Sequence, residues 1–313
     1  MNEKTKHVIE SCLSEAPCEL DVRCGEPMAN RCTFGVGGPA DCLLRPSGEG
    51  FPAFVAALFS RARAWDVPVF VLGGGANVVV ADSGIRGIVL DTGGWTGEAG
   101  SKTGTPCLRS GTSVDDAAEI AAGLGLSGLE FLTGMPGSVG GAVWMNARCY
   151  GREVADVLDE TEFLDLSADP PARFRRAANP EDFGYKRSPF QSRRTFILSA
   201  AFKLERREPQ AIRAEMDGYR RDRREKGHFR LPSAGSVFKN NPAFGKPTGK
   251  IVDELGLRGL RIGAAQVAPW HGNIIVNTGG ATAADIRALT ETVAARVRAA
   301  TGFELEPEIL FVP

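Results

Sequence analysis

Glycine is the feature of this sequence that most restricts its fold. Glycine accounts for 38 of the 313 residues, or about one residue in eight. Its usual share is about 7%. Many of them fall in two apolar segments, 71–82 and 125–151. A core β-strand accepts few glycines, because glycine has no side chain to pack. The two segments are therefore predicted to be loops whose backbone closely approaches another group.

Composition excludes several classes of protein. Hydrophobic residues make up 43% and charged residues 24%, and the net charge is -1. These are ordinary values for a globular protein, and the charge balance argues against a dedicated nucleic-acid binder. No run of about 18 apolar residues is present, and residues 1–20 lack the apolar core of a signal peptide. We therefore expect a cytoplasmic protein that does not enter a membrane.

The seven cysteines show no metal-binding pattern. Five of them lie in the first 42 residues, but none forms a CxxC pair and their spacings do not fit a zinc site. They are predicted to be reduced and mostly buried thiols, and no metal is expected.

Three zones of strands and helices are predicted, at 1–90, 91–207 and 208–303, followed by a C-terminal strand within 304–313. Helices are predicted at 52–65, 113–123, 209–226 and 286–300, and strands at 41–46, 69–72, 85–90, 161–166, 195–204 and 303–311. In the last strand, Glu304, Glu306 and Glu308 would share one face.

The first glycine segment predicts an anion site. A buried strand runs into Gly73, Gly74 and Gly75, followed by Ala76 and Asn77. Consecutive glycines allow backbone N–H groups to surround an anion. The segment is not the GxGxxG dinucleotide fingerprint, because strand-like residues follow it instead of a helix. A tight turn is the alternative.

The second glycine segment predicts a backbone surface for a large ligand. It holds seven glycines in the range 125–151. This pattern suits a backbone that lies flat against a planar or phosphorylated ligand. Amides would come from 135–138 and a polar side chain from Asn146. A buried glycine-rich loop is the alternative.

Three further positions carry reactive groups. Ser236 lacks the GxSxG spacing of a hydrolase nucleophile and none of the three histidines suggests a triad, so it is either a proton donor or a turn serine. Glu308 follows Pro307 and either faces a cleft or shares a solvated strand face. Two cations beside a tyrosine, in 183–190, suit anion binding or a solvated basic turn.

Taken in order, these segments resemble the UDP-N-acetylenolpyruvoylglucosamine reductases, also called UDP-N-acetylmuramate dehydrogenases or the MurB family. The matching stretches, which span most of the chain, are 30–38, 72–77, 128–141 with Met145 and Asn146, 185–188, 233–239, 275–277 and 305–308. The form of 233–236, with 249–254 after it, resembles the shorter subtype without the substrate-capping tyrosine loop.

The resemblance implies an α+β fold. It would comprise an FAD-binding module of the vanillyl-alcohol-oxidase (PCMH) type in two subdomains, 1–90 and 91–207, and a C-terminal α+β substrate domain, 208–303. The C-terminal strand, 304–313, would return to the first subdomain. The implied cofactor is non-covalent FAD, with NADPH as co-substrate. The implied FAD-binding residues are Gly73, Gly74, Gly75, Ala76, Asn77, Gly134, Pro136, Gly137, Ser138, Gly140, Gly141 and Asn146.

The resemblance also implies an activity: hydride passes from NADPH to FAD N5 and then to the methylene carbon of the enolpyruvyl ether of UDP-N-acetylglucosamine. Ser236 would supply the proton, with Glu308 as the second catalytic group. Lys186 stands where the family has an arginine, and Arg187 is the fallback for that role. Implied substrate contacts are Tyr185, Lys239, Asn240 and His271.

Two alternatives stay open. One is another FAD-dependent oxidase or dehydrogenase of the same architecture, since a fold alone does not define a reaction. The other is a catalytically degenerate nucleotide-binding relative, which the lysine at position 186 makes conceivable.

Overall fold

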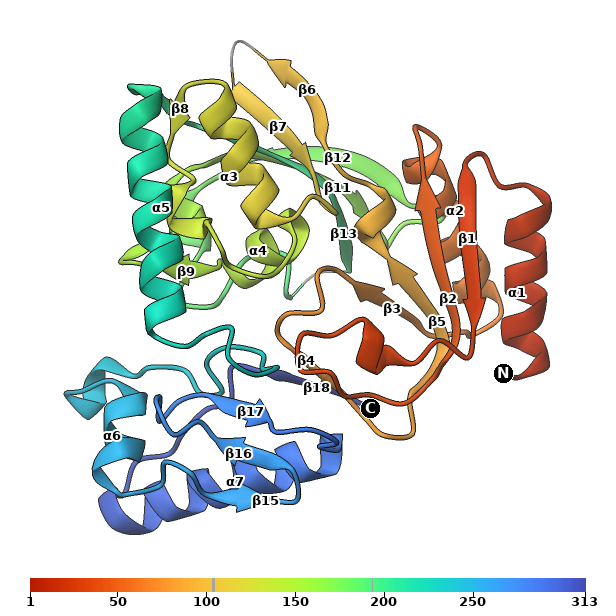
Figure 1. Ribbon diagram of the computed structural model, residues 1–313. Helices are drawn as coiled ribbons and strands as arrows, with labels where there is room; N and C mark the ends of the chain where they lie inside the picture. The colour runs from red at the N-terminus through yellow and green to blue at the C-terminus, as the bar shows by residue number, and fades with distance from the viewer. Residues whose placement is uncertain (103–104, 193) are drawn as a thin grey trace. The chain divides into compact units, whose positions relative to one another are not determined.

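The computed structural model describes residues 1–102, 105–192 and 194–313 (Figure 1). Its contacts divide the chain into two compact units, each built from separated segments. Unit 1 contains 1–24, 41–74 and 86–221, and unit 2 contains 25–40, 75–85 and 222–313. One boundary falls between Gly74 and Gly75, inside the first glycine segment. The three-domain division drawn from the sequence stays a prediction.

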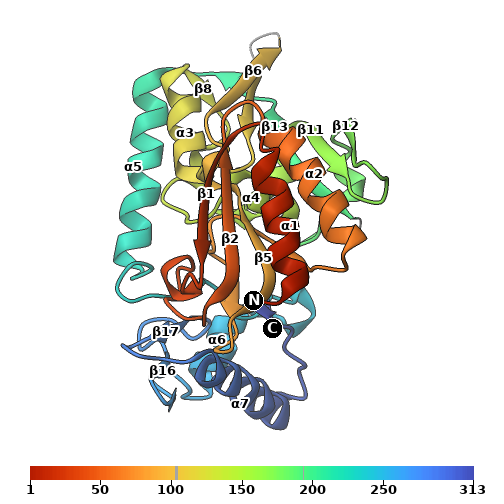
Figure 2. The same ribbon diagram turned by 90° about the vertical axis from the view of Figure 1, so that its right-hand side faces the viewer.

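One half of unit 1 is a four-stranded sheet covered by two helices. The strand order is β1-β2-β5-β3 (Glu19–Cys24, Ala40–Ser47, Ile85–Asp91 and Val69–Leu72). Helices α1 (Glu3–Ser14) and α2 (Phe51–Ala64) lie next to each other beside this sheet (Figures 1 and 2). Val8 and Ile9 of α1 and Phe54 and Leu58 of α2 share one core. Asn2 caps α1 by accepting a hydrogen bond from the Thr5 amide at 2.8 Å.

The other half of unit 1 is a five-stranded antiparallel sheet with helices beside it. The order is β12-β11-β13-β7-β6 (Ala172–Ala177, Leu158–Asp165, Thr195–Phe202, Thr105–Arg109 and Glu98–Lys102). Helices α3 (Val114–Gly123) and α5 (Pro209–Glu225) are joined by ion pairs from Arg213 and Arg220 to Glu119. The short helix α4 (Val139–Met145) shares their core.

Unit 2 packs two helices against small sheets. Strands β15 (Arg261–Ile262), β16 (Ala265–Val267) and β17 (Ile275–Asn277) form an antiparallel sheet, and α6 (Thr248–Glu254) and α7 (Ala283–Thr301) complete its core. Strand β4 (Val78–Val80) pairs in parallel with β18 (Leu310–Val312). The predicted apolar stripe of α7 is buried, and the helix begins with a capping box formed by Thr282 and Asp285.

The remaining elements are short. They are β8 (Leu126–Ser127) with β14 (Glu205–Arg206), β9 (Arg148–Cys149) with β10 (Arg152–Glu153), and 3₁₀ helices at Met28–Asn30, Thr92–Gly94, Glu130–Leu132, Val154–Asp156, Pro180–Asp182 and Pro242–Phe244.

All four predicted helices are confirmed, but the predicted strand at 303–311 is wrong. Regular pairing begins only at Leu310. Glu306 and Pro307 are both exposed and Glu308 and Ile309 are both buried, so the alternation breaks at this point. Proline has no N–H group to donate to a ladder, which accounts for the break. Among the longer elements, α1, β1, β6, β7 and β12 were not predicted from the sequence.

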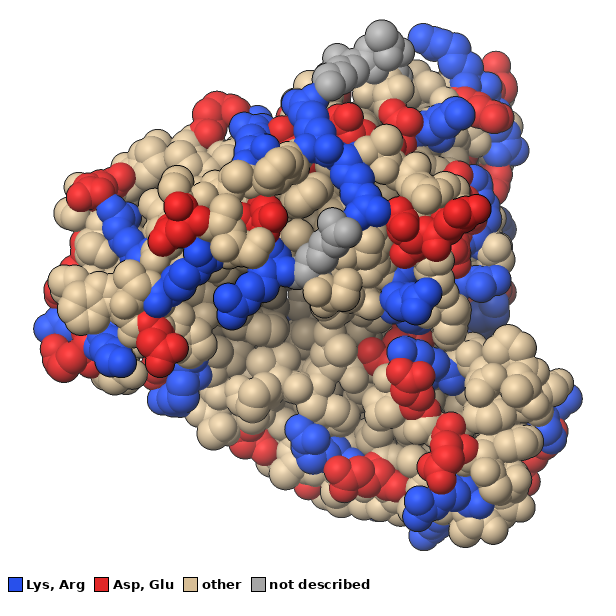
Figure 3. All heavy atoms as spheres, turned by 180° about the vertical axis from the view of Figure 1, so that it is seen from behind, with Lys and Arg blue, Asp and Glu red and all other residues tan. Residues whose placement is uncertain are grey.

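The surface and the thiols add three observations. Acidic and basic side chains are interspersed on the face drawn in Figure 3. None of the helices that the structure describes has the length and apolar character of a membrane span. The seven cysteines are free thiols, and the described residues contain no cluster of three or more His, Cys, Asp or Glu side chains suited to a metal.

Candidate functional site

The first glycine segment forms a loop between β3 and β4 that offers unused backbone donors. Within the described parts of the chain, the amides of Gly73, Gly74, Gly75 and Ala76 donate to no protein acceptor. A Cβ at Gly73 would lie 2.5 Å from the Ser138 Oγ, and one at Gly74 would lie 2.6 Å from the Gly137 Cα. No side chain fits at Gly74, because the neighbour there is backbone.

Gly75 and Asn77 are held by other parts of unit 2. Gly75 has a φ of +62°, and a Cβ there would lie 2.0 Å from the Arg31 carbonyl oxygen. Its carbonyl accepts a hydrogen bond from the Thr33 amide at 3.0 Å. The Asn77 side-chain amide donates to the Glu308 carbonyl at 3.0 Å. In unit 2 this loop is therefore anchored both to 31–33 and to the segment of Glu308.

The second glycine segment differs from the flat backbone surface that we expected. It leads into α4, and most of its amides are used inside the protein. Gly134 donates to the Asp115 carboxylate at 2.8 Å, Gly140 to the Ser110 carbonyl at 2.8 Å, and Gly141 to the Ser138 Oγ at 3.3 Å. Pro136 is exposed. Among the predicted cofactor residues of this segment, Gly137 and Ser138 are the described ones whose amides donate to no protein acceptor.

These donors suit a phosphate-bearing group. Gly74 and Gly137 bring two loops of unit 1 into backbone contact, and both loops keep amides without an acceptor in the described part of the chain. Backbone amides gathered at glycines bind phosphate oxygens well. The Ser110 Oγ, which lies beside Gly140, is also buried without a hydrogen-bond partner. The residues present therefore fit the pyrophosphate of a dinucleotide such as FAD.

Tyr185 and Lys186 occupy the tip of a tight turn. Gly184 and Arg187 exchange two backbone hydrogen bonds of 3.0 Å, and Lys186 has a φ of +56°. A positive φ at the third residue is typical of a type II turn. An extended segment at 183–187 would point Lys186 and Arg187 to opposite sides, but the chain reverses here. Lys186 is half-buried and Arg187 is exposed.

Asn146 does not present a free polar side chain. It is 0% exposed and ends α4 in the left-handed conformation, with a φ of 45°. Its amide nitrogen donates to the Glu153 carboxylate and to the Gly184 carbonyl, both at 3.0 Å. Its oxygen accepts from the Ala155 amide at 3.0 Å. The structure thus places Asn146 within the protein framework, in contact with the turn of Lys186.

In unit 2, backbone hydrogen bonds bring the segment of Ser236 to the segment of Glu308. The Glu308 amide donates to the Val237 carbonyl at 2.7 Å, and Lys239 donates to the Glu306 carbonyl at 2.9 Å. Ser236 itself forms a bridge with Ile274 on its other side. The two residues are 72 positions apart in the sequence, and only the fold makes their segments neighbours.

Glu308 is distinguished from the other glutamates of its segment by burial. It is 8% exposed, whereas Glu304 and Glu306 are exposed. The expected common face for the three carboxylates is therefore wrong. A buried carboxylate is costly unless it has partners or a function, so the solvated alternative for Glu308 is excluded.

The predicted substrate contacts of unit 2 have structural partners. The Lys239 ammonium pairs with the Glu306 carboxylate, and the Asn240 side chain accepts from the Thr248 amide at 2.9 Å. His271 Nδ1 accepts from the Asn273 amide at 3.1 Å. Burial lowers the pKa of His271 below its usual value, which favours the neutral imidazole.

Two residues that the sequence analysis missed hold these segments in place. The buried Asn273 side chain donates to the Phe238 carbonyl at 2.8 Å and accepts from the Phe238 amide at 3.0 Å. The Gln191 side chain donates to the Lys186 carbonyl at 3.1 Å. Asn273 had one usable signal, since it is a polar residue next to the apolar run at 274–276.

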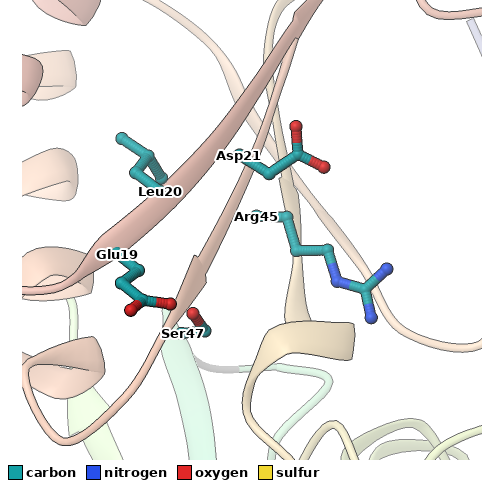
Figure 4. A pocket seen from close by; sticks show the side chains of 5 residues that line it. All are labelled: Glu19, Leu20, Asp21, Arg45 and Ser47. Carbon is teal, nitrogen blue, oxygen red and sulfur yellow. The ribbon is translucent and has the colours of Figure 1, made fainter.

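A shallow hollow elsewhere is unrelated to these residues. It has a volume of about 330 Å³ and lies on β1 and β2 of unit 1, lined by Glu19, Leu20, Asp21, Arg45 and Ser47 (Figure 4). None of the predicted site residues lines it.

Known proteins resemble the chain along most of its length. Residues 52–169 match the FAD binding domain family, and residues 227–312 match the C-terminal domain of UDP-N-acetylenolpyruvoylglucosamine reductase. The reductase of Treponema pallidum (strain Nichols) is 40% identical, covering 91% of this chain and 92% of the relative. The chain belongs to the UDP-N-acetylenolpyruvoylglucosamine reductase family.

Other members of this reductase family support the same assignment. The Heliobacterium modesticaldum reductase is 37% identical over 91% of this chain and 88% of its own length. The crystal structure of the Thermus caldophilus reductase superposes with a TM-score of 0.75 at 33% identity, covering 95% of this chain and all of that one. The predicted fold class, an FAD-binding α+β module joined to a reductase C-terminal domain, is confirmed.

Proposed function

We propose that this flavoenzyme uses NADPH to reduce the enolpyruvyl ether of UDP-N-acetylglucosamine to UDP-N-acetylmuramate, a step of peptidoglycan precursor synthesis. The observation that carries the proposal is the pairing of two distant segments, by the 2.7 Å hydrogen bond from the Glu308 amide to the Val237 carbonyl. Because of this pairing, the backbone of Ser236 lies close to the backbone of Glu308, whose carboxylate is buried. Family membership at 40% identity supports the same reaction.

In this proposal different segments supply different kinds of group. FAD, when bound without a covalent link, supplies hydride transfer between the nicotinamide and the substrate carbon. The amides of 73–76 and 137–138 would hold its pyrophosphate. The Ser236 hydroxyl would give its proton to the substrate carbon that bears the carboxylate. Glu308 would polarise the groups that take part in this proton transfer.

The cation of the proposed reaction is Lys186. A positive charge stabilises the negative charge that develops next to the substrate carboxylate. Lysine supplies this charge but lacks the planar fork with which arginine holds a carboxylate through two hydrogen bonds. Tyr185, Lys239, Asn240 and His271 are the proposed substrate contacts. The product belongs to wall synthesis, so we propose a cytoplasmic role that affects cell shape and division.

A single anaerobic titration tests the reaction. The purified protein should be yellow, and NADPH should bleach it. Adding UDP-N-acetylglucosamine enolpyruvate without oxygen should restore the flavin absorption and yield UDP-N-acetylmuramate. Restoration by oxygen alone would instead identify an oxidase, and a colourless protein with no flavin would identify a degenerate relative. NADH in place of NADPH tests the choice of nicotinamide.

The non-covalent attachment has its own test. Acid precipitation should release all of the flavin into the supernatant. Yellow colour that stays in the pellet would show a covalent bond.

A further inference from the structure

The buried side chain of Asn146 links the end of α4 to the loop that carries Lys186. Asn146 donates to the Gly184 carbonyl at 3.0 Å, and this carbonyl also accepts the Arg187 amide that closes the turn. The Asn146 amide thus contacts the first residue of the turn directly. Because Asn146 is 0% exposed, water does not readily replace this hydrogen bond.

Asn146 is itself fixed by its other contacts. Its amide nitrogen also donates to Glu153 and its oxygen accepts from Ala155, so both polar atoms have partners on other segments of unit 1. Its left-handed backbone is a conformation that asparagine adopts more readily than most residues. The side chain therefore has one orientation, and that orientation points at Gly184.

Two neighbouring contacts anchor the far side of the turn. The Ser188 hydroxyl donates to the Trp144 carbonyl at 2.7 Å, and Gln191 donates to the Lys186 carbonyl at 3.1 Å. Trp144 and Asn146 both belong to the C-terminal end of α4, whose first residues follow Ser138. One rigid helix of about 10 Å thus connects the loop with free amides to the turn with the cation.

We propose that Asn146 is a positioning residue, which holds the turn 184–187 so that Lys186 stands at a defined distance from the loop at 137–138, at the start of α4. The inference rests on the proposed function for the role of Lys186. The hydrogen bond from Asn146 to the turn does not depend on that function. In this proposal Asn146 acts through Lys186, because both polar atoms of its side chain already have protein partners.

Two variants test this role. Asn146→Gly removes the side chain and keeps the left-handed backbone without strain. Asn146→Asp keeps an acceptor for Ala155 but loses the donor to Gly184. The matched control is Asp66→Gly, since Asp66 is exposed and also has a positive φ, of 54°. Flavin content and melting temperature report whether each variant is folded.

The first readout does not require turnover. Trypsin cleaves after Lys186 and Arg187. Without the hydrogen bond from Asn146 the turn should be more mobile, so both Asn146 variants should be cleaved there several-fold faster than the wild type or Asp66→Gly. Mass spectrometry identifies the fragments that end at these residues. An unchanged cleavage rate would overturn the inference, even if the protein proved not to be a reductase.

The second readout separates positioning from general damage. Flavin reduction by NADPH should be unchanged in Asn146→Gly, and reoxidation by the enolpyruvyl substrate should slow by up to about 100-fold, the cost of a misplacement near 1 Å. In a Lys186→Met background the same substitution should have no further effect. Equal slowing in both backgrounds would show a merely structural role and overturn the inference.

Discussion

The loops at 73–76 and 137–138 offer backbone amides that are not covered by side chains. The segments at 236–239 and 306–308 differ, because their backbone is already hydrogen-bonded and only their side chains are available. In the first region the amides have no acceptor among the residues that the structure describes, and Gly74 leaves no space for a Cβ. In the second region the amides of Val237, Lys239 and Glu308 all bond to carbonyls. The first region is therefore sensitive to the size of a side chain, and the second to its chemical identity.

The largest expected effect comes from the chemical identity of Ser236. Ser236→Ala should leave flavin reduction by NADPH unchanged, because that step protonates no substrate carbon. Reoxidation by the enolpyruvyl substrate should slow by about 10²–10⁴, the usual contribution of a positioned proton donor. Stopped-flow absorbance of the flavin measures both steps. Ser233→Ala, in the same segment, is the control, and equal slowing of both steps would mean that Ser236 is structural.

Charge at the turn should matter next. Lys186→Met should slow the substrate step about 10²-fold, since it removes one stabilising cation. Arg187→Met should change this step little, and Lys186→Arg should be tolerated. The same stopped-flow assay ranks the three variants. If Arg187→Met proved the more damaging of the two Met variants, Arg187 would be the catalytic cation.

Size rather than chemistry should control the glycine region. Gly74→Ala forces a Cβ to within 2.6 Å of the Gly137 Cα, and overpacking of this kind costs about 1–3 kcal/mol of stability. We expect a lower melting temperature together with reduced flavin content.

The matched control is Gly73→Ala, whose Cβ meets only the end of the Ser138 side chain. That hydroxyl can rotate away and lose only its 3.3 Å hydrogen bond from the Gly141 amide, so the effect should be smaller. Similar losses in the two variants would remove the contrast between backbone and side-chain neighbours.

The smallest effect concerns pH and His228 of unit 2. Burial, with a contribution from Arg223, lowers the pKa of His228 from 6.5 to about 4. The unfolded chain then binds the proton more readily than the folded one, so stability is complete above pH 6.5 and falls as the pH drops toward 4. A shift of this size in full corresponds to about 3 kcal/mol, and solvent screening around this partly exposed ring reduces the loss to the order of 1 kcal/mol.

Melting temperatures measured from pH 7 to pH 4 test this effect. The fall in melting temperature should be shallower in His228→Gln than in the wild type. Parallel curves for the two proteins would show that His228 does not contribute.

The sequence alone determined the long elements and the residue types of the site. Helix α7 has a capping box, an apolar stripe and a terminal glycine, all of them local features, and it formed as predicted. The three glycines at 73–75 predicted an accessible backbone, because glycine is the residue that has no side chain to cover it. Ser236 and Glu308 were selected through the order of their motifs.

Tertiary structure decided how those residues are used. Asn146 looked like a ligand contact, yet three hydrogen bonds hold it inside the protein. Glu308 looked like one of three equivalent carboxylates, yet it alone of the three is buried. Hydrogen-bond partners and burial depend on segments that are distant in the chain, and local patterns carry no information about those partners. For the same reason, the neighbouring positions of the Ser236 and Glu308 segments followed only from the fold.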